Sequence, residues 1–182
     1  PPPPPPTTLA RPRRQRQMCI RDRFDPSVRA GDIPSAGGAA LLLNPDSTAA
    51  GVTVFPAFYA RAGKDADVTA RLVNSLGGPE RIRARFGALL VGIPAAQRQT
   101  GADQLEAFQA CSGIALPVVD YRKFIGEFAS ASAVALFMAV TFTQAGTISG
   151  PLCNGRSTRL ADKGTLVLGF GNQVTAVEVL RR

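Results

Sequence analysis

"TLVLGFGNQVTAVEVL", Thr165 to Leu180, contains the clearest fold signal in the chain. Its two apolar halves are rich in β-branched residues, which favour strands. They lie on either side of Gly171-Asn172-Gln173, a sequence typical of a tight turn between two strands. We therefore predict a β-hairpin here, with a "GFG" turn at Gly169, Phe170 and Gly171, where glycine permits backbone conformations that other residues avoid.

Strand-like and helix-like stretches alternate upstream of this hairpin. Short apolar runs predict strands, and apolar residues repeated every three or four positions predict helices. The predicted strands are residues 38–43, 52–59, 89–93 and 115–119, and the predicted helices are residues 67–76, 79–89, 102–111 and 127–143. Asp67 is a candidate N-cap, and the last helix is apolar almost all round, which predicts burial on every side. The alternation predicts an α/β fold with a central sheet.

Residues 1–23 differ in composition from the rest of the chain. They contain six of the 21 Lys and Arg but one of the 13 Asp and Glu, so 15 basic and 12 acidic residues remain elsewhere. A proline tract followed by clustered arginines would suit phosphate binding. However, "RRQRQMCIRDR", Arg13 to Arg23, resembles residue for residue the translation of an adapter from transposase-based DNA libraries. We interpret residues 1–23 as artefactual and expect one domain at 24–182, truncated on its N-terminal side.

Other features of the sequence exclude whole classes of protein. No apolar run approaches the about 18–20 residues that cross a bilayer, so we expect no membrane span. Outside the basic segment, Cys111 and Cys153 are the two cysteines and lack metal-like spacing. We interpret them as buried thiols, and expect no metal site and a cytoplasmic location.

Several stretches resemble, in order and approximate spacing, the C-terminal half of the β-ketoacyl-[acyl-carrier-protein] synthases of the thiolase superfamily. They correspond to that family's Gly-Glu-Gly-Ala turn, Asp-x-x-Glu helix, Lys-x-x-x-Gly-His segment and Gly-Phe-Gly-Gly loop. The stretches are "FDPSVRAGDIPSAGGAALLLNP" (24–45), "GADQLEAF" (101–108), "RKFIGEFASASAVAL" (122–136) and "LVLGFGNQVTAVEVLRR" (166–182). The resemblance implies a thiolase-like α/β fold, with a mixed sheet, a buried helix and covering helices.

The resemblance also implies a chemistry that this chain lacks the usual groups to perform. In the family, a Cys of the N-terminal half carries the acyl chain, and two His donate hydrogen bonds to the thioester oxygen while malonyl loses CO₂. This chain contains no His, and the two family positions fall at Ala95 and Glu127. Alanine has no donor. An ionised Glu127 would repel the enolate, a protonated one could donate, and a third interpretation makes it an acid at a helix N-terminus.

The remaining motif positions have structural interpretations beside the functional ones. Glu106 and Arg122 could form a structural ion pair. Phe170 belongs either to a simple turn or to a turn that also gates an acyl pocket, as the family resemblance implies. The family motif positions are Asp103, Glu106, Arg122 and Gly126, together with the loop Gly169, Phe170 and Gly171.

The loss of both His favours a β-ketoacyl synthase-like subunit that performs no condensation, similar to the chain-length factors of polyketide and aryl-polyene systems. The resemblance implies acyl carrier protein-bound substrates, no other cofactor, and pairing with a catalytic ketosynthase or a second copy. The alternative is a divergent condensing or acyl-transferring enzyme. Nucleic-acid binding is not expected once residues 1–23 are set aside, and an isolated half would expose a large apolar surface.

Overall fold

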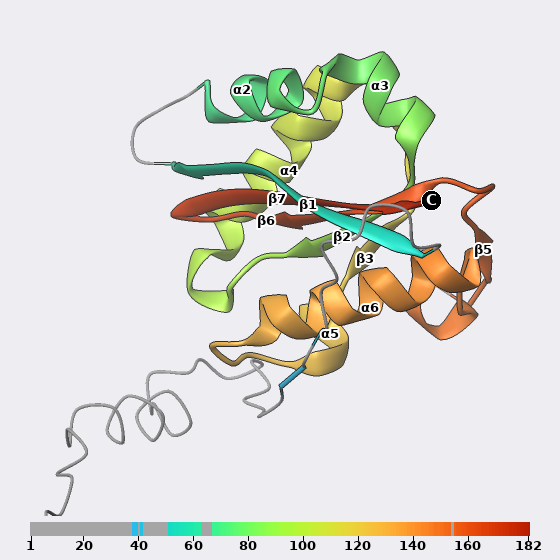
Figure 1. Ribbon diagram of the computed structural model, residues 1–182. Coiled ribbons are helices and arrows are strands. Elements are labelled where there is room, and N and C mark those ends of the chain that lie inside the picture. The colour runs from blue at the N-terminus through green and yellow to red at the C-terminus, as the bar shows by residue number, and fades with distance from the viewer. Residues whose placement is uncertain (1–37, 40, 42–50, 63–66, 154) are drawn as a thin grey trace, which may run out of the picture.

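The computed structural model describes residues 38–39, 41, 51–62, 67–153 and 155–182. The basic segment, and residues 40, 42 and 43 of the strand predicted at 38–43, therefore lie outside the described residues. The described chain forms three layers, with a central sheet between two layers of helices (Figure 1). This confirms the predicted α/β organisation.

The central sheet is mixed. Its strand order is β1-β7-β6-β2-β3, in which β6, β2 and β3 run parallel while β7 is antiparallel to both β6 and β1. A separate antiparallel pair, β4 and β5, lies beyond one end of the sheet. The strands are β1 (Val52–Arg61), β2 (Phe86–Gly92), β3 (Val118–Asp120), β4 (Thr147–Ile148), β5 (Thr158–Arg159), β6 (Gly164–Gly169) and β7 (Gln173–Arg181).

Helices cover both faces of the sheet. In Figure 1, α2, α3 and α4 lie on one side and α5 and α6 on the other. The helices are α2 (Val68–Ser75), α3 (Gly78–Arg85), α4 (Arg98–Ser112), α5 (Arg122–Ile125) and α6 (Ala131–Ala145), with short 3₁₀ turns at η1 (Ala95–Gln97) and η2 (Gly150–Leu152). None of the helices in the described part of the chain is long and apolar enough to cross a membrane.

Two hydrophobic cores, one on each face, explain the continuous apolar run in β2. Leu89 and Val91 pack into the core beneath α2, α3 and α4, whereas Ala88 and Leu90 pack into the core beneath α6. Because successive side chains of a strand point to opposite faces, a strand covered on both sides is apolar at every position. The strand predicted at 89–93 is present, as β2 (Phe86–Gly92).

The predicted C-terminal hairpin is confirmed, with one shift of its turn. β6 and β7 pair antiparallel, and their last paired positions are Gly169 and Thr175. The connecting loop consists of Phe170, Gly171 and Asn172. Gln173, which we assigned to the turn, is the first residue of β7.

Some predicted boundaries are wrong because tertiary pairing decides them. The helix predicted at 79–89 ends at Arg85, since Phe86 is fully buried and begins the ladder of β2 with β6. The strand predicted at 115–119 starts at Val118, after Pro117, which has no N–H to offer to a ladder. Asp67 occupies the N-cap position of α2 but makes no capping hydrogen bond with its side chain.

The predictions of complete burial for α6 and for the cysteines are also wrong within the described residues. Ala131, Ala135, Ala139 and Thr143 recur every fourth position and face the sheet, and they are the buried residues of α6. Phe137, on another side of the helix, is 48% exposed. The outer side of α6 is thus not covered by described residues, and Phe137 is exposed there together with the polar Thr141 and Gln144. Cys111 is exposed and Cys153 is partly buried, so neither is a fully buried thiol.

Candidate functional site

A cavity of about 660 Å³ opens where the carboxyl ends of the three parallel strands meet. Gly92 ends β2, Tyr121 directly follows β3 and Gly169 ends β6, and all three line the cavity. The carboxyl ends of parallel strands are the usual place for ligands in α/β proteins, because the chain leaves the sheet there and frees backbone and side chains for contact. This cavity is the candidate site.

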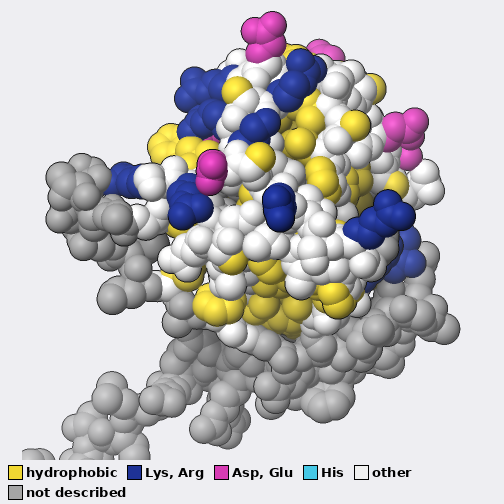
Figure 2. All heavy atoms as spheres, turned by 90° about the vertical axis from the view of Figure 1, so that its right-hand side faces the viewer, with side chains coloured by type: hydrophobic (Ala, Val, Ile, Leu, Met, Phe, Trp, Pro, Cys, Tyr) yellow, Lys and Arg dark blue, Asp and Glu magenta, His cyan; other side chains and the backbone are white. Residues whose placement is uncertain are grey.

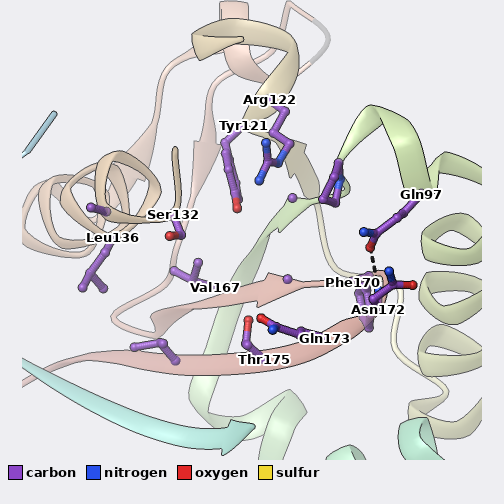
Figure 3. A pocket seen from close by; sticks show the side chains of 15 residues that line it. Gln97, Tyr121, Arg122, Ser132, Leu136, Val167, Phe170, Asn172, Gln173 and Thr175 are labelled. Atoms are coloured by element: carbon purple, nitrogen blue, oxygen red, sulfur yellow. Dashed lines mark hydrogen bonds between the residues drawn. The ribbon is translucent and has the colours of Figure 1, made fainter. Parts of the chain in front are cut away.

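The walls of the cavity are polar at one side and apolar at the other. Tyr121 and Arg122 point into it from the turn after β3, and Gln97 and Asn172 lie across from them (Figure 3). The other, more apolar wall is formed by Val167 and Val177 of the hairpin together with Ala133 and Leu136 of α6, with Ser132 and Thr175 among them. The cavity therefore suits a ligand with a polar group and an apolar body.

Hydrogen bonds fix the GFG loop to the layer of α4. The backbone N–H of Gly171 donates to Oε1 of Gln104 at 2.7 Å, and Nε2 of Gln104 donates back to the carbonyl oxygen of Gly171 at 3.1 Å. The backbone N–H of Asn172 donates to Oε1 of Gln97 at 2.6 Å (Figure 3). The N–H of Phe170 donates to the carbonyl of Gly92 at 3.1 Å. One rim of the cavity is thus held in place by side-chain amides that compensate for missing ladder bonds.

Phe170 belongs both to the cavity wall and to the core. It is buried, and its ring lies 6.2 Å from that of Phe108 on α4 at an angle of 54°. Such tilted aromatic pairs are favourable. The predicted turn at Gly169–Gly171 is present, and the gating role of Phe170 stays a prediction that would require this contact to break.

Arg122 pairs with Glu127 rather than with Glu106. Nη1 of Arg122 donates to Oε2 of Glu127 at 2.5 Å, in a partly buried contact. Glu106 lies exposed on α4, which covers the opposite face of the sheet from α5. The predicted ion pair between Glu106 and Arg122 is therefore wrong, since the sheet separates the two side chains.

The position of Glu127 removes one of its three interpretations. α6 begins at Ala131 and has no acidic residue in its first turn, so Glu127 is not a helix N-terminal acid. In the observed contact its carboxylate oxygen accepts a hydrogen bond from Arg122. The oxygen that contacts Arg122 is thus an acceptor, and the salt bridge fixes the guanidinium beside the cavity.

Tyr121 is the site residue that sequence analysis missed. It is 2% exposed and packs against Gly92: a Cβ at position 92 would lie 2.0 Å from the tyrosine hydroxyl oxygen, so only glycine leaves room for this ring. Burial raises the pKa of Tyr121 above its ordinary value of 10.0, while the positive charge of Arg122 lowers it in part. The phenol is accordingly protonated at neutral pH and able to donate a hydrogen bond.

The remaining motif positions lie around the cavity or away from it. Ala95 is partly buried in η1, between Pro94 and Gln97, which both line the cavity. Asp103 is exposed and accepts a hydrogen bond from Nε2 of Gln99 at 2.8 Å, so the acidic side of α4 faces away from the site. Gly126 is buried at the end of α5 with φ +80°, a conformation that favours glycine.

Within the described ranges no group of three or more His, Cys, Asp or Glu side chains is arranged to hold a metal ion. No protein-family model matches this chain, and no curated protein matches it either. The function must therefore be argued from the cavity and the motif positions around it.

Proposed function

We propose that this chain is the C-terminal half of a β-ketoacyl synthase-like subunit that takes part in acyl-chain elongation without condensing substrates itself. One observation carries the proposal: Gly169 and Phe170 of the GFG loop line a cavity, and the two positions that correspond to the family's His pair lie next to residues that line the same cavity. Ala95 directly follows the cavity-lining Pro94, and Glu127 holds the cavity-lining Arg122. Neither position supplies the family's pair of hydrogen-bond donors to a thioester oxygen.

The architecture supports a thiolase-like fold for this half. The resemblance implies a mixed sheet with a buried helix and covering helices, and a last strand that follows the Gly-Phe-Gly loop. The sheet is mixed, helices cover both of its faces, and β7 follows that loop. These features are shared by other α/β proteins as well, so they support the proposal jointly with the motif positions.

The outer face of α6 supports the proposal that a second half packs against this one. Phe137 on α6 and Phe124 on α5 are both 48% exposed, although large aromatic side chains contribute most when buried. In Figure 2, hydrophobic side chains gather on the lower part of the displayed face. An apolar surface of this kind is typical of an interface.

The proposal assigns the cavity to the acyl chain of a substrate carried on acyl carrier protein. Its apolar wall, formed by Val167, Val177 and Leu136, would contact the chain, and its polar side would face the thioester. The partner would be a catalytic ketosynthase or a second copy of the complete subunit, with the acyl tunnel shaped at their junction. No cofactor is needed for this role.

One observation favours the second candidate, a divergent condensing or acyl-transferring enzyme. The hydroxyl of Tyr121 faces the cavity and remains a donor at neutral pH, so one fixed hydrogen bond to a thioester oxygen is available without histidine. The family uses a pair of donors, and the loss of a single oxyanion donor commonly costs about 100- to 1000-fold in rate. We therefore favour the non-catalytic role.

A decarboxylation assay on the complete subunit tests the proposal. The purified subunit should release no CO₂ from malonyl-acyl carrier protein, and the double variant Ala95→His/Glu127→His should not create the activity by itself. A catalytic ketosynthase assayed in parallel provides the positive control. Decarboxylation by the unmodified subunit alone would contradict the non-catalytic role and favour the divergent enzyme.

A further inference from the structure

Tyr121 and Arg122 contact each other at the polar side of the cavity. The guanidinium carbon of Arg122 lies 5.8 Å from the centroid of the Tyr121 ring, so the cation packs against the face of the ring. The hydroxyl hydrogen of Tyr121 is not used in that contact. Because the oxygen points into the cavity, this hydrogen is available to an acceptor bound there (Figure 3).

We propose that Tyr121 donates this hydrogen to the carbonyl oxygen of a neutral acyl ligand, such as a thioester, and that Arg122 positions the hydroxyl. The inference rests on the proposed function for the class of ligand. Tyr121 is the binding residue, and Arg122 acts through it. Glu127 in turn holds Arg122, so a chain of contacts runs from Glu127 to the ligand.

The charges around the cavity favour a neutral carbonyl over a carboxylate. Arg122 is the one charged residue among the described residues that line the cavity. Its Nη1 pairs with Glu127, and its buried Nε has no hydrogen-bond partner among the described residues. A carboxylate ligand would bring a second anion next to this pair and compete for the same cation. A neutral carbonyl needs one donor only and adds no charge to a partly desolvated site.

The shape of the cavity places the rest of the ligand. Tyr121 lies on one side, and the apolar side chains of Val167 and Leu136 lie beyond it toward α6 (Figure 3). A carbonyl held at Tyr121 would lay its alkyl chain along these residues. Gly92 fixes the position of the hydroxyl, because any larger residue there would displace the tyrosine ring.

The test measures the binding of two probes to the full chain: the neutral thioester hexanoyl-N-acetylcysteamine and the anion hexanoate. The chain has two tyrosines and no tryptophan, so a Tyr59→Phe background leaves Tyr121 as the sole ultraviolet reporter. Tyr59 is exposed on β1 and lies outside the cavity lining. Affinities come from calorimetry, and the tyrosinate absorbance gives the ionisation of Tyr121.

We expect the thioester to bind more tightly than hexanoate. Glu127→Gln should reduce this difference in affinity, because it removes the carboxylate that neutralises Arg122 and so favours the anion. In the calorimetric series, Tyr121→Phe, which keeps the ring against Gly92, should weaken thioester binding about tenfold, as the loss of one hydrogen bond would. Bound thioester should raise the pKa of Tyr121, since the bond requires the protonated phenol.

Arg122→Gln separates positioning from structural support. It should raise the pKa of Tyr121, because the charge of Arg122 lowers that pKa, and it should weaken thioester binding. Arg122→Lys, which keeps a cation, should bring both the pKa of Tyr121 and the thioester affinity part of the way back to the parent values. A thermal melt of each variant reports whether the fold is retained.

The outcomes distinguish this inference from the proposed function. Equal thioester affinity for Tyr121→Phe and its parent would overturn the role of Tyr121 while leaving an acyl cavity in place. A preference for hexanoate would overturn the neutral ligand. Failure of the parent chain to bind the thioester at all would contradict the acyl cavity, and with it the proposed function.

Discussion

Replacement of Gly171 by alanine probes how strongly the GFG loop is held. A Cβ at this position would lie 1.9 Å from Oε1 of Gln97, the atom that accepts the hydrogen bond from the N–H of Asn172. The residue also has φ +132°, which side chains rarely adopt. Backbone strain of this kind costs about 1–3 kcal/mol, and losing the hydrogen bond adds about 0.5–1.5 kcal/mol. We expect Gly171→Ala to lower the free energy of unfolding by about 2–4 kcal/mol.

Gly113→Ala is the matched control for this change. Gly113 ends α4 with φ +59°, and a Cβ there would meet open space. Its substitution therefore carries backbone strain alone, about 1 kcal/mol. Urea unfolding of both variants measures the difference, and thioester binding should fall for Gly171→Ala only, because the loop lines the cavity. Equal destabilisation by the two substitutions would refute the reasoning that Gln97 and Gln104 hold the loop.

Two further predictions concern the buried ion pair and the outer face of α6. Glu178 is 4% exposed and pairs with Arg85 at 2.8 Å. Arg85→Met should lower the free energy of unfolding by about 3–5 kcal/mol, because it leaves a buried carboxylate without its partner. In denaturant unfolding, the double variant Arg85→Met/Glu178→Leu should recover most of this stability. In sedimentation experiments, Phe137→Lys should reduce self-association of the chain more than Phe55→Lys does. Phe55 is the control because it is 58% exposed and lies on the edge strand β1 rather than on α6. An equal effect of both substitutions would contradict a specific interface on α6.

Local sequence patterns predicted an element correctly where all of its residues favour the same secondary structure and the same degree of burial. The hairpin at the C-terminus and the buried strand β2 follow from β-branched and continuous apolar runs. The helix predicted at 79–89 was wrong beyond Arg85, because the pairing of Phe86 with β6 overrides its local neighbours. The apolar composition of α6 indicated that the helix is buried, but it did not indicate which of its sides are covered. The covered sides depend on which other elements pack against the helix.

The candidate site was predictable only in part. The family resemblance pointed to the GFG loop, which contributes Gly169 and Phe170 to the cavity lining, and to Ala95 and Glu127, which lie next to lining residues. It did not indicate Tyr121, because that residue acquires its role from the meeting of three strand ends and from the space left by Gly92. Spacing along the chain did not reveal that Arg122 pairs with Glu127. By sequence alone Glu106 was an equally suitable acid, and only the fold shows that the sheet separates Glu106 from Arg122.

Sequencing the source DNA upstream of the codon for Phe24 tests the central claim most directly. The account predicts that the run from Arg13 to Arg23 is absent there. In its place an open frame should continue, long enough for a second domain and without a Cys at the family's nucleophile turn. A Cys at that turn would contradict the non-catalytic role and favour the divergent enzyme. The presence of the basic run in the source DNA would contradict the truncation and restore residues 1–23 as a phosphate-binding arm.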